Sequence, residues 1–257
     1  MTAGEMLIGF KTIVIKEVLR FGRIWLQTVV PPVITISLYF VIFGSLIGSQ
    51  ISDMDGFKYI DYIVPGLIMM AVITNSYANV VSSFYGSKFH HHIEEMLVSP
   101  LPNYLIVTGF MVGGIARGLL VGTAVTVVAS LFTDLHFYNV PVIITIVILT
   151  STLFALAGLI NAVFAKSFDD ISIVPTFVLT PLTYLGGVFY TINMLPEFWQ
   201  KVSLINPVLY MVNGFRYGFL GVSDISILWS YTIIIGFIVA LYSYAIYLLR
   251  TGYGIRR

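Results

Sequence analysis

Six long apolar stretches dominate this sequence of 257 residues. Each has about the 20 residues that a helix needs to cross the hydrocarbon core of a bilayer. Apolar residues make up 58% of the chain and charged residues only 10%, a balance that suits lipid as the solvent. We therefore predict an all-α integral membrane protein, a single transmembrane domain of residues 1–257. Its expected spans are 24–48, 62–85, 104–132, 140–165, 171–190 and 227–249.

The segment before the first span, residues 5–23, is amphipathic. Lys16, Arg20 and Arg23 recur at helical spacing, whereas apolar residues such as Leu7 cover another face. This pattern is typical of an interfacial helix in the headgroup region, where Lys and Arg meet anionic lipid. The alternative interpretation is that the segment extends the first span into the cytosol.

The distribution of Lys and Arg predicts the orientation, because cytoplasmic loops of membrane proteins carry an excess of both. With both termini inside, nine of the 13 Lys and Arg residues are cytoplasmic, three are outside and one, Arg117, lies within a span. The reverse orientation would place the basic termini outside. We therefore expect cytoplasmic N- and C-termini.

Several function classes find no support in the sequence. A formal net charge of +1 gives no basic surface for nucleic acid, and the absence of cysteine excludes disulfides and thiolate metal sites. The chain contains no phosphate-binding loop. All Asp and Glu residues fall in expected loops or at span ends, which disfavours a proton-coupled carrier. We expect this chain to bind no cofactor and to draw its energy from a partner.

A polar segment, residues 87–103, separates the second and third spans and is too long for a simple hairpin. His90 to His92 precede Glu94 and Glu95, and two prolines follow. The pattern predicts a short cytoplasmic helix, stopped by the prolines, that offers carboxylates to a soluble partner. Solvated surface is the alternative. A metal site is disfavoured, because adjacent helix positions point about 100° apart.

Polar residues inside the expected spans are further candidates. Arg117 lies near the middle of the third span, where an unpaired guanidinium costs several kcal/mol. It is structural, part of a solute path or a contact between two copies of the chain. Asn75 and Asn79 lie one turn apart in the second span, and Thr176 and Thr180 do so in the fifth. Such stripes form interhelical hydrogen bonds or line a solute path, because polar groups that face lipid are costly.

One stretch, residues 180–221, resembles the signature region of type-2 ABC transporter permeases. Three further stretches, VPGLIMM, IEEMLVSPLP and FDDISIVPTFVLTPLTYLGGVFY, extend the resemblance over the whole chain. The six expected spans and the expected cytoplasmic termini agree with it. The residues that carry the resemblance in the signature region are Gly186, Gly187, Phe189, Tyr190, Leu195, Pro196, Asn206, Pro207, Tyr210, Arg216 and Tyr217.

The resemblance implies an exporter in the bacterial inner membrane. Two copies of the chain would pair with two copies of a cytoplasmic ATPase that binds ATP and Mg, and membrane lipid would surround them. Residues 5–23 resemble the connecting helix of such permeases. The segment around Glu94 and Glu95 resembles the helix that couples to the ATPase. Residues 191–226 resemble a re-entrant helical hairpin at the outer face.

The resemblance also assigns roles to individual residues. The turn that contains Lys166, Asp169 and Asp170 is expected to support the coupling helix. In the re-entrant segment, Asn206 and Pro207 would form the turn between the two arms. The residues expected to mark this segment are Pro196, Asn206, Pro207 and Arg216.

Two other function classes remain as alternatives to a permease subunit. A gradient-driven secondary transporter or channel would need an ion site or carboxylate inside the membrane. A membrane-embedded enzyme would need a nucleophile or metal set near one membrane face. The sequence favours neither, and it does not rank the amphiphilic or lipid-linked solutes that such permeases move.

Overall fold

The computed structural model describes residues 2–47, 54 and 56–254. All regular elements within these residues are helical, apart from an isolated bridge between Met54 and Phe57, so the predicted all-α class is confirmed. Gly48, which ends the first expected span, and Arg256 and Arg257 lie outside the described residues. Five described helices are long and apolar enough to cross a membrane: Trp25–Gly44, Tyr59–Phe89, Asn103–Ala129, Val140–Phe164 and Ile227–Thr251.

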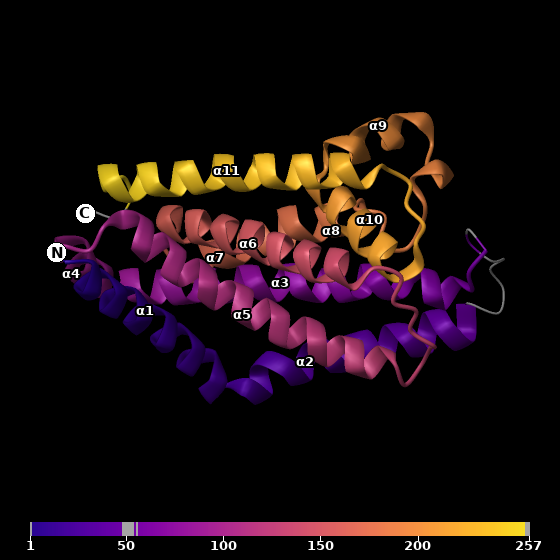
Figure 1. The fold of residues 1–257 in the computed structure, drawn as a ribbon, viewed down its shortest axis with the longest axis horizontal. Coiled ribbons are helices and arrows are strands. Elements are labelled where there is room, and N and C mark those ends of the chain that lie inside the picture. Colours follow the sequence, from indigo (N-terminus) through magenta and orange to yellow (C-terminus); the bar gives the residue numbers. More distant parts are fainter. Residues whose placement is uncertain (1, 48–53, 55, 255–257) are drawn as a thin grey trace.

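The long helices run along the longest axis of the molecule (Figure 1). At the centre, α3 (Tyr59–Phe89) packs against α5 (Asn103–Ala129), α6 (Val140–Phe164) and α10 (Pro207–Leu220). In the most apolar part of α3, 83% of the residues are buried. The corresponding share is 17% in the span that begins with α2 (Trp25–Tyr39) and 22% in α11 (Ile227–Thr251). These two helices therefore form the perimeter and leave apolar surface for lipid to cover.

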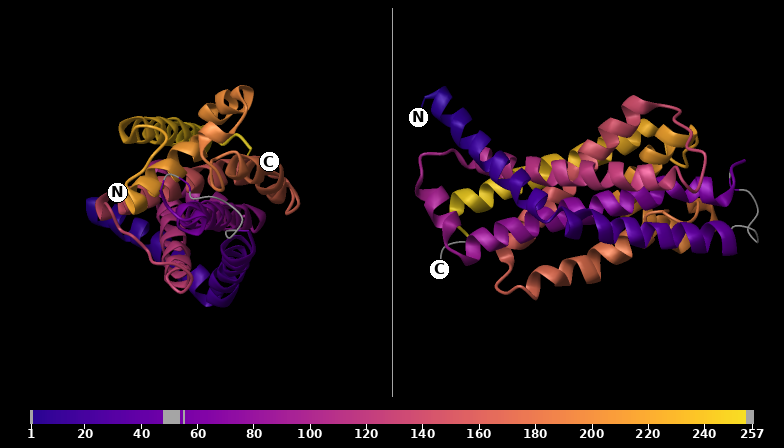
Figure 2. Two further views of the ribbon diagram at one scale, coloured as in Figure 1. Left: turned by 90° about the vertical axis from the view of Figure 1, so that its right-hand side faces the viewer. Right: turned by 90° about the horizontal axis from the view of Figure 1, so that it is seen from below.

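The amphipathic segment forms α1 (Ala3–Arg23), whose first turns diverge from the bundle (Figure 2). Thr2 and Glu5 form a capping box at its start, in which N of Thr2 donates to Oε2 of Glu5 at 2.8 Å. Leu7 and Ile8 are exposed, as an interfacial helix requires of its lipid-facing side. The helix ends at Arg23. The chain turns at Ile24 into α2, and α2 continues as the π-helical segment η1 (Phe40–Ile47).

Two rows of glycine on α5 allow neighbouring helices to approach closely. Gly109 and Gly113 lie against Ile13 and Glu17 of α1, and a Cβ at Gly113 would stand 2.6 Å from Cβ of Glu17. Arg117 follows Gly113 by one helical turn and therefore lies near the junction of α1 and α2. The second row lies against α3 and α6 and consists of Gly114, Gly118 and Gly122.

The fifth expected span, residues 171–190, differs most from the prediction. The chain there forms α7 (Asp170–Val174), the π-helical segment η2 (Pro175–Leu179) and α8 (Thr180–Tyr184), each of five residues. Pro175 and Pro181 lack the N–H that a regular helix donates to its preceding turn, which fits the widened helix. Because the run ends at Tyr184, it falls short of the roughly 20 residues of a spanning helix.

The expected segment 191–226 contains a helical hairpin at the end of the molecule opposite α4 (His92–Val98) (Figure 1). A 3-10 turn, η3 (Ile192–Met194), leads into α9 (Glu197–Ile205), which meets α10 at Asn206. Oδ1 of Asn206 accepts a hydrogen bond from N of Val208 at 2.9 Å and caps α10. Its Nδ2 donates to O of Leu182 at 2.6 Å, which fixes the hairpin to α8.

Candidate functional site

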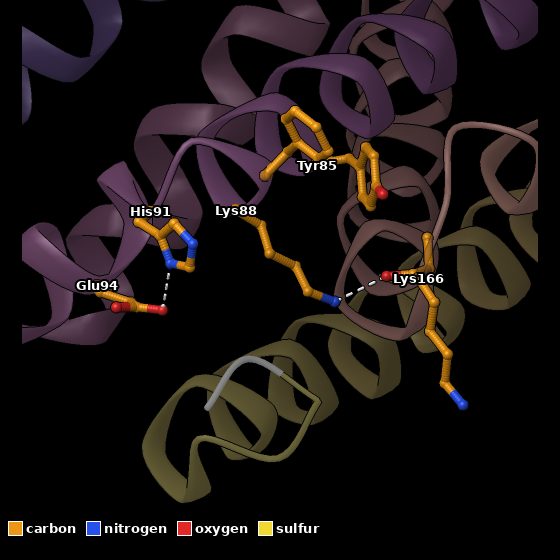
Figure 3. Close-up of a pocket in the computed structure, with 7 residues that line it drawn as sticks. Tyr85, Lys88, His91, Glu94 and Lys166 are labelled. Carbon is orange, nitrogen blue, oxygen red and sulfur yellow. Dashed lines mark hydrogen bonds and ion pairs between the residues drawn. The ribbon is translucent and has the colours of Figure 1, made fainter. Parts of the chain in front are cut away.

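A cavity of about 250 Å³ lies at the end of the molecule where α1 begins and α11 ends (Figures 1 and 3). α4 and the turn after α6 border it, so the structure brings together two of the predicted coupling residues, Glu94 and Lys166. His91, from the histidine run of the predicted short helix, also lines this cavity. The remaining lining residues are not among the predicted site residues. They are Tyr85, Lys88, Phe89 and Ala165.

α4 packs against the core through Ile93 and, partly, Met96 and Leu97, and presents its acidic side chains outward. Ile93 is fully buried, whereas Glu94 and Glu95 are exposed. His91, just before α4, has a φ of 60°, a left-handed conformation that reverses the chain after α3. Its Nδ1 lies 2.9 Å from Oε1 of Glu94 (Figure 3). The short helix ends at Val98, before the first proline, as the sequence predicts.

Lys88 joins the end of α3 to the end of α6. Its Nζ donates to O of Val163 at 2.6 Å and to O of Ala165 at 2.8 Å (Figure 3). These carbonyls belong to the C-terminal end of α6, where a cation is favourable. Phe168 adds an edge-on contact with Tyr85, with ring centres 4.9 Å apart. The ends of α3 and α6 and the following turn therefore form one packed unit.

Asp170 shapes the turn after α6. Its Oδ2 accepts hydrogen bonds from N of Lys166 at 2.8 Å and N of Ser167 at 3.1 Å. The bond from the Lys166 backbone, helped by the Ser167 side chain, holds the pKa of Asp170 below its ordinary value. Lys166 and Asp169 are exposed. Of the three predicted residues of this turn, one thus holds its conformation and two are open to solvent.

An ion pair on the inner face of α1, between the buried Glu17 and the partly exposed Arg20, is the main feature that sequence analysis missed. Glu17 is 0% exposed; its Oε1 accepts from Oγ of Ser83 at 2.6 Å, and its Oε2 lies 3.6 Å from Nε of Arg20. The expectation that all carboxylates lie in loops or at span ends does not hold for Glu17. Burial raises the pKa of this carboxyl, although the Ser83 hydrogen bond and the Arg20 charge oppose the rise.

Arg20 extends this network to α3. Its Nη2 donates to O of Asn79 at 2.8 Å and to Oδ1 of the same residue at 2.7 Å, while Nη1 lies 3.4 Å from Oγ of Ser82. Asn79 is fully buried, between Arg20 of α1 and Gly113 of α5. Its place in a solute path stays a prediction.

Arg117 is the second guanidinium of this region. Its Nη2 donates to Oδ1 of Asn75 at 3.3 Å, and its buried Nε has no hydrogen-bond partner among the described residues. Within that part of the chain, no ion pair joins Arg117 to an Asp or Glu. A cavity of about 310 Å³ between α2 and α3 reaches Asn75. Its lining residues are Gln27, Pro31, Pro32, Thr35, Ile36, Tyr39, Met70, Ala71, Thr74 and Asn75.

The structure does not bring the two predicted threonines to this cavity, whose described lining comes from α2 and α3 only. Thr176 and Thr180 are exposed, and their hydroxyls donate within their own helical run, to O of Ser172 at 2.9 Å and O of Pro175 at 3.0 Å. Their role in a solute path remains a prediction.

Arg216, which the sequence assigns to the re-entrant segment, is buried in α10. Its guanidinium carbon lies 3.9 Å from the ring centre of Tyr62, and its Nη2 donates to O of Gly187 at 2.5 Å. Gly187 has a φ of 71°, which glycine adopts without strain. Arg216 therefore ties α10 to α3 and to the turn after α8. Pro196, from the same segment, directly precedes α9.

Comparison with known proteins agrees with the sequence resemblance. The profile of a family described as "ABC-2 type transporter" matches residues 8–220. The chain is 55% identical over 249 residues to the inner membrane transport permease YadH of Escherichia coli (strain K12), and the match covers 97% of each chain. It is 24% identical over 185 residues to nodulation protein J of Rhizobium leguminosarum bv. viciae, covering 72% of this chain and 71% of the relative. With its several apolar helices, the chain is a multi-pass membrane protein that belongs to the ABC-2 type transporter family.

Proposed function

We propose that the chain is the membrane subunit of an ATP-driven exporter, in which two copies pair with two copies of a separate cytoplasmic ATPase. One observation carries the proposal: α4, with Glu94 and Glu95 exposed, directly follows the central helix α3. The family and the relative named a transport permease support a role in transport. ATP and Mg would bind to the ATPase, and the chain itself would catalyse no reaction.

Movement of α4 would be transmitted to the core of the bundle through two contacts. Ile93 is fully buried at the base of α4, and Lys88 binds the end of α6 at 2.6 and 2.8 Å. A closing ATPase dimer that displaces α4 would therefore displace α3 and α6 as well. Because α3 also carries Asn75 and Asn79, its movement would change the polar region at the centre of the molecule. The solute, an amphiphilic or lipid-linked molecule, would then be released to the outside.

A sixth crossing by residues 171–190 is part of the proposal. The ends of α6 and α11 are close together. Just after α11, a Cβ at Gly254 would stand 3.0 Å from O of Val163, near the end of α6. α11 begins at the opposite end of the molecule (Figure 1). The chain between α6 and α11 must therefore run from one end to the other, and α7, η2 and α8 supply most of that length. The α9–α10 hairpin would then re-enter the membrane from the outer face.

The location follows from the relatives and from charge. The relative from E. coli is named an inner membrane permease, which supports the bacterial inner membrane for this chain as well. With α4 on the cytoplasmic side, most Lys and Arg residues face the cytoplasm. α1 would then lie among the cytoplasmic headgroups, with Leu7 and Ile8 toward lipid.

The test is to purify the C-terminally tagged chain in mild detergent from its native cell and to identify what accompanies it. A stoichiometric ATPase is expected. Glu95→Arg should remove most of this ATPase while membrane insertion is normal. Glu197→Arg is the matched control, because Glu197 is exposed on α9 at the opposite end. Equal ATPase recovery with both variants would remove Glu95 from the interface, and wild-type preparations free of ATPase in detergent and in nanodiscs would refute the assembly.

A gradient-driven secondary transporter is the second candidate, because Glu17 is a buried carboxylate of the type that such carriers titrate. Its bonds to Ser83 and Arg20 favour a structural role instead. Glu17→Gln keeps an oxygen for Ser83 but cannot carry a proton in and out. An exporter driven by ATP should tolerate this change, whereas a proton-driven carrier should lose transport.

A further inference from the structure

The polar cluster where α1, α3 and α5 meet has an unbalanced charge. It contains two guanidiniums, Arg20 and Arg117, but one carboxylate, Glu17. The two guanidiniums are bound by Asn79 and Asn75, one turn apart on α3, so they are close neighbours. Glu17 is already engaged by Arg20 and Ser83. The cluster therefore lacks one negative charge, and a cation so placed is stable only with an anion or water beside it.

The cavity between α2 and α3 shares one residue, Asn75, with this cluster. Asn75 accepts the hydrogen bond of Arg117 and also lines the cavity. Gln27, Thr35 and Thr74 contribute further polar groups, and the remaining lining is apolar apart from the hydroxyl of Tyr39. Most of α2 is unburied within the chain, so the cavity is not sealed by protein on that side. The cavity thus reaches Asn75, the hydrogen-bond partner of an uncompensated cation, while its apolar lining residues suit a hydrocarbon chain.

We propose that this cavity is the solute site of the transporter and that the solute is an amphiphile with an anionic head, such as an alkyl phosphate. The anion would pair with Arg117 beside Asn75, and the chain would lie between α2 and α3. Arg suits this task, because its planar guanidinium donates two parallel hydrogen bonds to a phosphate or carboxylate. The assignment of the occupant as transported solute rests on the proposed function. A neutral head would leave the cation unpaired and bind less tightly.

The test measures binding of radiolabelled dodecyl phosphate to the purified full chain in phosphatidylcholine nanodiscs, without an ATPase. Dodecyl β-glucoside, which has the same chain and a neutral head, and inorganic phosphate, which has no chain, are used as competitors. Dodecyl phosphate should bind about tenfold tighter than the glucoside, the factor expected of one hydrogen-bonded charge. Inorganic phosphate should compete still more weakly, because it buries no apolar chain. Equal affinity for the glucoside would overturn the proposal.

Two variants test the role of Arg117. Arg117→Gln removes the charge and should weaken binding about tenfold. Asn75→Asp places a carboxylate where Oδ1 of Asn75 now accepts from Arg117, so it supplies the missing anion internally and should abolish binding without loss of the fold. Arg250→Gln, at an exposed residue in the last turn of α11, is the control and should bind as the wild type does. Should Arg117→Gln fail to insert, Asn75→Asp decides, and wild-type affinity in that variant would overturn the proposal.

Membrane lipid is the other source of an anionic head. Nanodiscs that contain phosphatidylglycerol separate the two sources: retained dodecyl phosphate binding supports a solute site, and complete displacement assigns the cavity to lipid and overturns the proposal. ATPase association is measured on the same wild-type protein. If the ATPase is stoichiometric but dodecyl phosphate does not bind, this inference alone is overturned. If no ATPase is found, the exporter assignment is overturned.

Discussion

Glu17 is buried at a point where the facing helix has no side chain. Gly113 of α5 lies against it, and this gap allows Oε1 of Glu17 to reach Ser83 of α3. The carboxylate is stable there only because Arg20 lies beside it and Ser83 donates to it. At the residue scale, the position of α1 thus depends on a small residue on one helix and an ion pair on the other.

The first prediction concerns Gly113→Ala. A Cβ at this position would stand 2.6 Å from Cβ of Glu17, a contact that requires one helix to shift. Overpacking of this kind lowers the free energy of unfolding by about 1–3 kcal/mol. Gly86→Ala is the matched control, because nothing lies within 4 Å of a Cβ at Gly86. Thermal unfolding in detergent should separate the two variants, and equal midpoints would contradict the close approach of α1 and α5.

The second prediction concerns the ion pair itself. Arg20→Met leaves the Glu17 carboxylate buried without its partner, and such a loss costs about 3 kcal/mol of unfolding free energy. The double variant Arg20→Met with Glu17→Gln removes both charges and should recover part of that loss. The same unfolding assay measures the coupling between the two positions. Purely additive effects would mean that the two charges do not interact.

The ion pair could not be predicted from the sequence of α1 alone. Lys16, Glu17 and Arg20 have the composition of a solvated polar face, and the helix periodicity is compatible with that interpretation. Burial of Glu17 depends on a helix 90 or more residues away in the chain. The available signal was the pair Gly109 and Gly113, a spacing of four that marks a close helix contact but does not name its partner.

At the element scale, α4 is attached to the bundle largely through Ile93. This side chain is fully buried, while the neighbouring glutamates and Val98 are exposed. A helix of seven residues is too short to be stable alone, so its position depends on packing against the bundle. The coupling role that we propose for α4 would therefore require both the exposed carboxylates and the buried anchor.

The third prediction follows from that anchor. Ile93→Asp places a charge in a fully buried position and should detach α4 from the bundle. Recovery of the ATPase with the tagged chain should fall severalfold, although the spans still insert. Val98→Asp, at a position 87% exposed, is the control and should retain the ATPase. If both variants retain it, α4 does not couple through a fixed position.

The sequence predicts some elements well because their signals are local. Apolar stretches long enough to span a bilayer appear as α3, α5, α6 and α11, and the prolines near residue 100 mark the end of α4. The 171–190 stretch is equally apolar, but Pro175 and Pro181 lie inside it, and its helix is shorter and partly π-helical. Hydropathy measures length of apolar sequence and does not detect how backbone hydrogen bonds adapt to proline.

At the scale of the whole molecule, the two ends have different characters. One end carries α4, the cavity at Lys88 and the ends of α6 and α11, and the other carries α9, the end of α10 and the start of α6 (Figure 1). The proposed exporter would need this separation, because α4, as the proposed coupling helix, and the α9–α10 hairpin would have to lie on opposite faces of the membrane. They do so only if residues 171–190 cross the membrane, which makes the number of crossings between α4 and α9 odd.

The fourth prediction tests whether residues 171–190 cross the membrane. The method is cysteine labelling, in which the wild-type chain gives no signal because it contains no cysteine. Val98→Cys and Phe198→Cys lie at exposed positions on the two ends, and Phe177→Cys lies at an exposed position in η2. With six crossings and cytoplasmic termini, a membrane-impermeant maleimide should label Phe198→Cys in spheroplasts and Val98→Cys only in inverted vesicles. Phe177→Cys should stay unlabelled in both, because lipid or a second copy of the chain covers it. Labelling of Val98→Cys and Phe198→Cys from the same side would mean that residues 171–190 do not cross, and the α9–α10 hairpin would then lie in the cytoplasm beside α4.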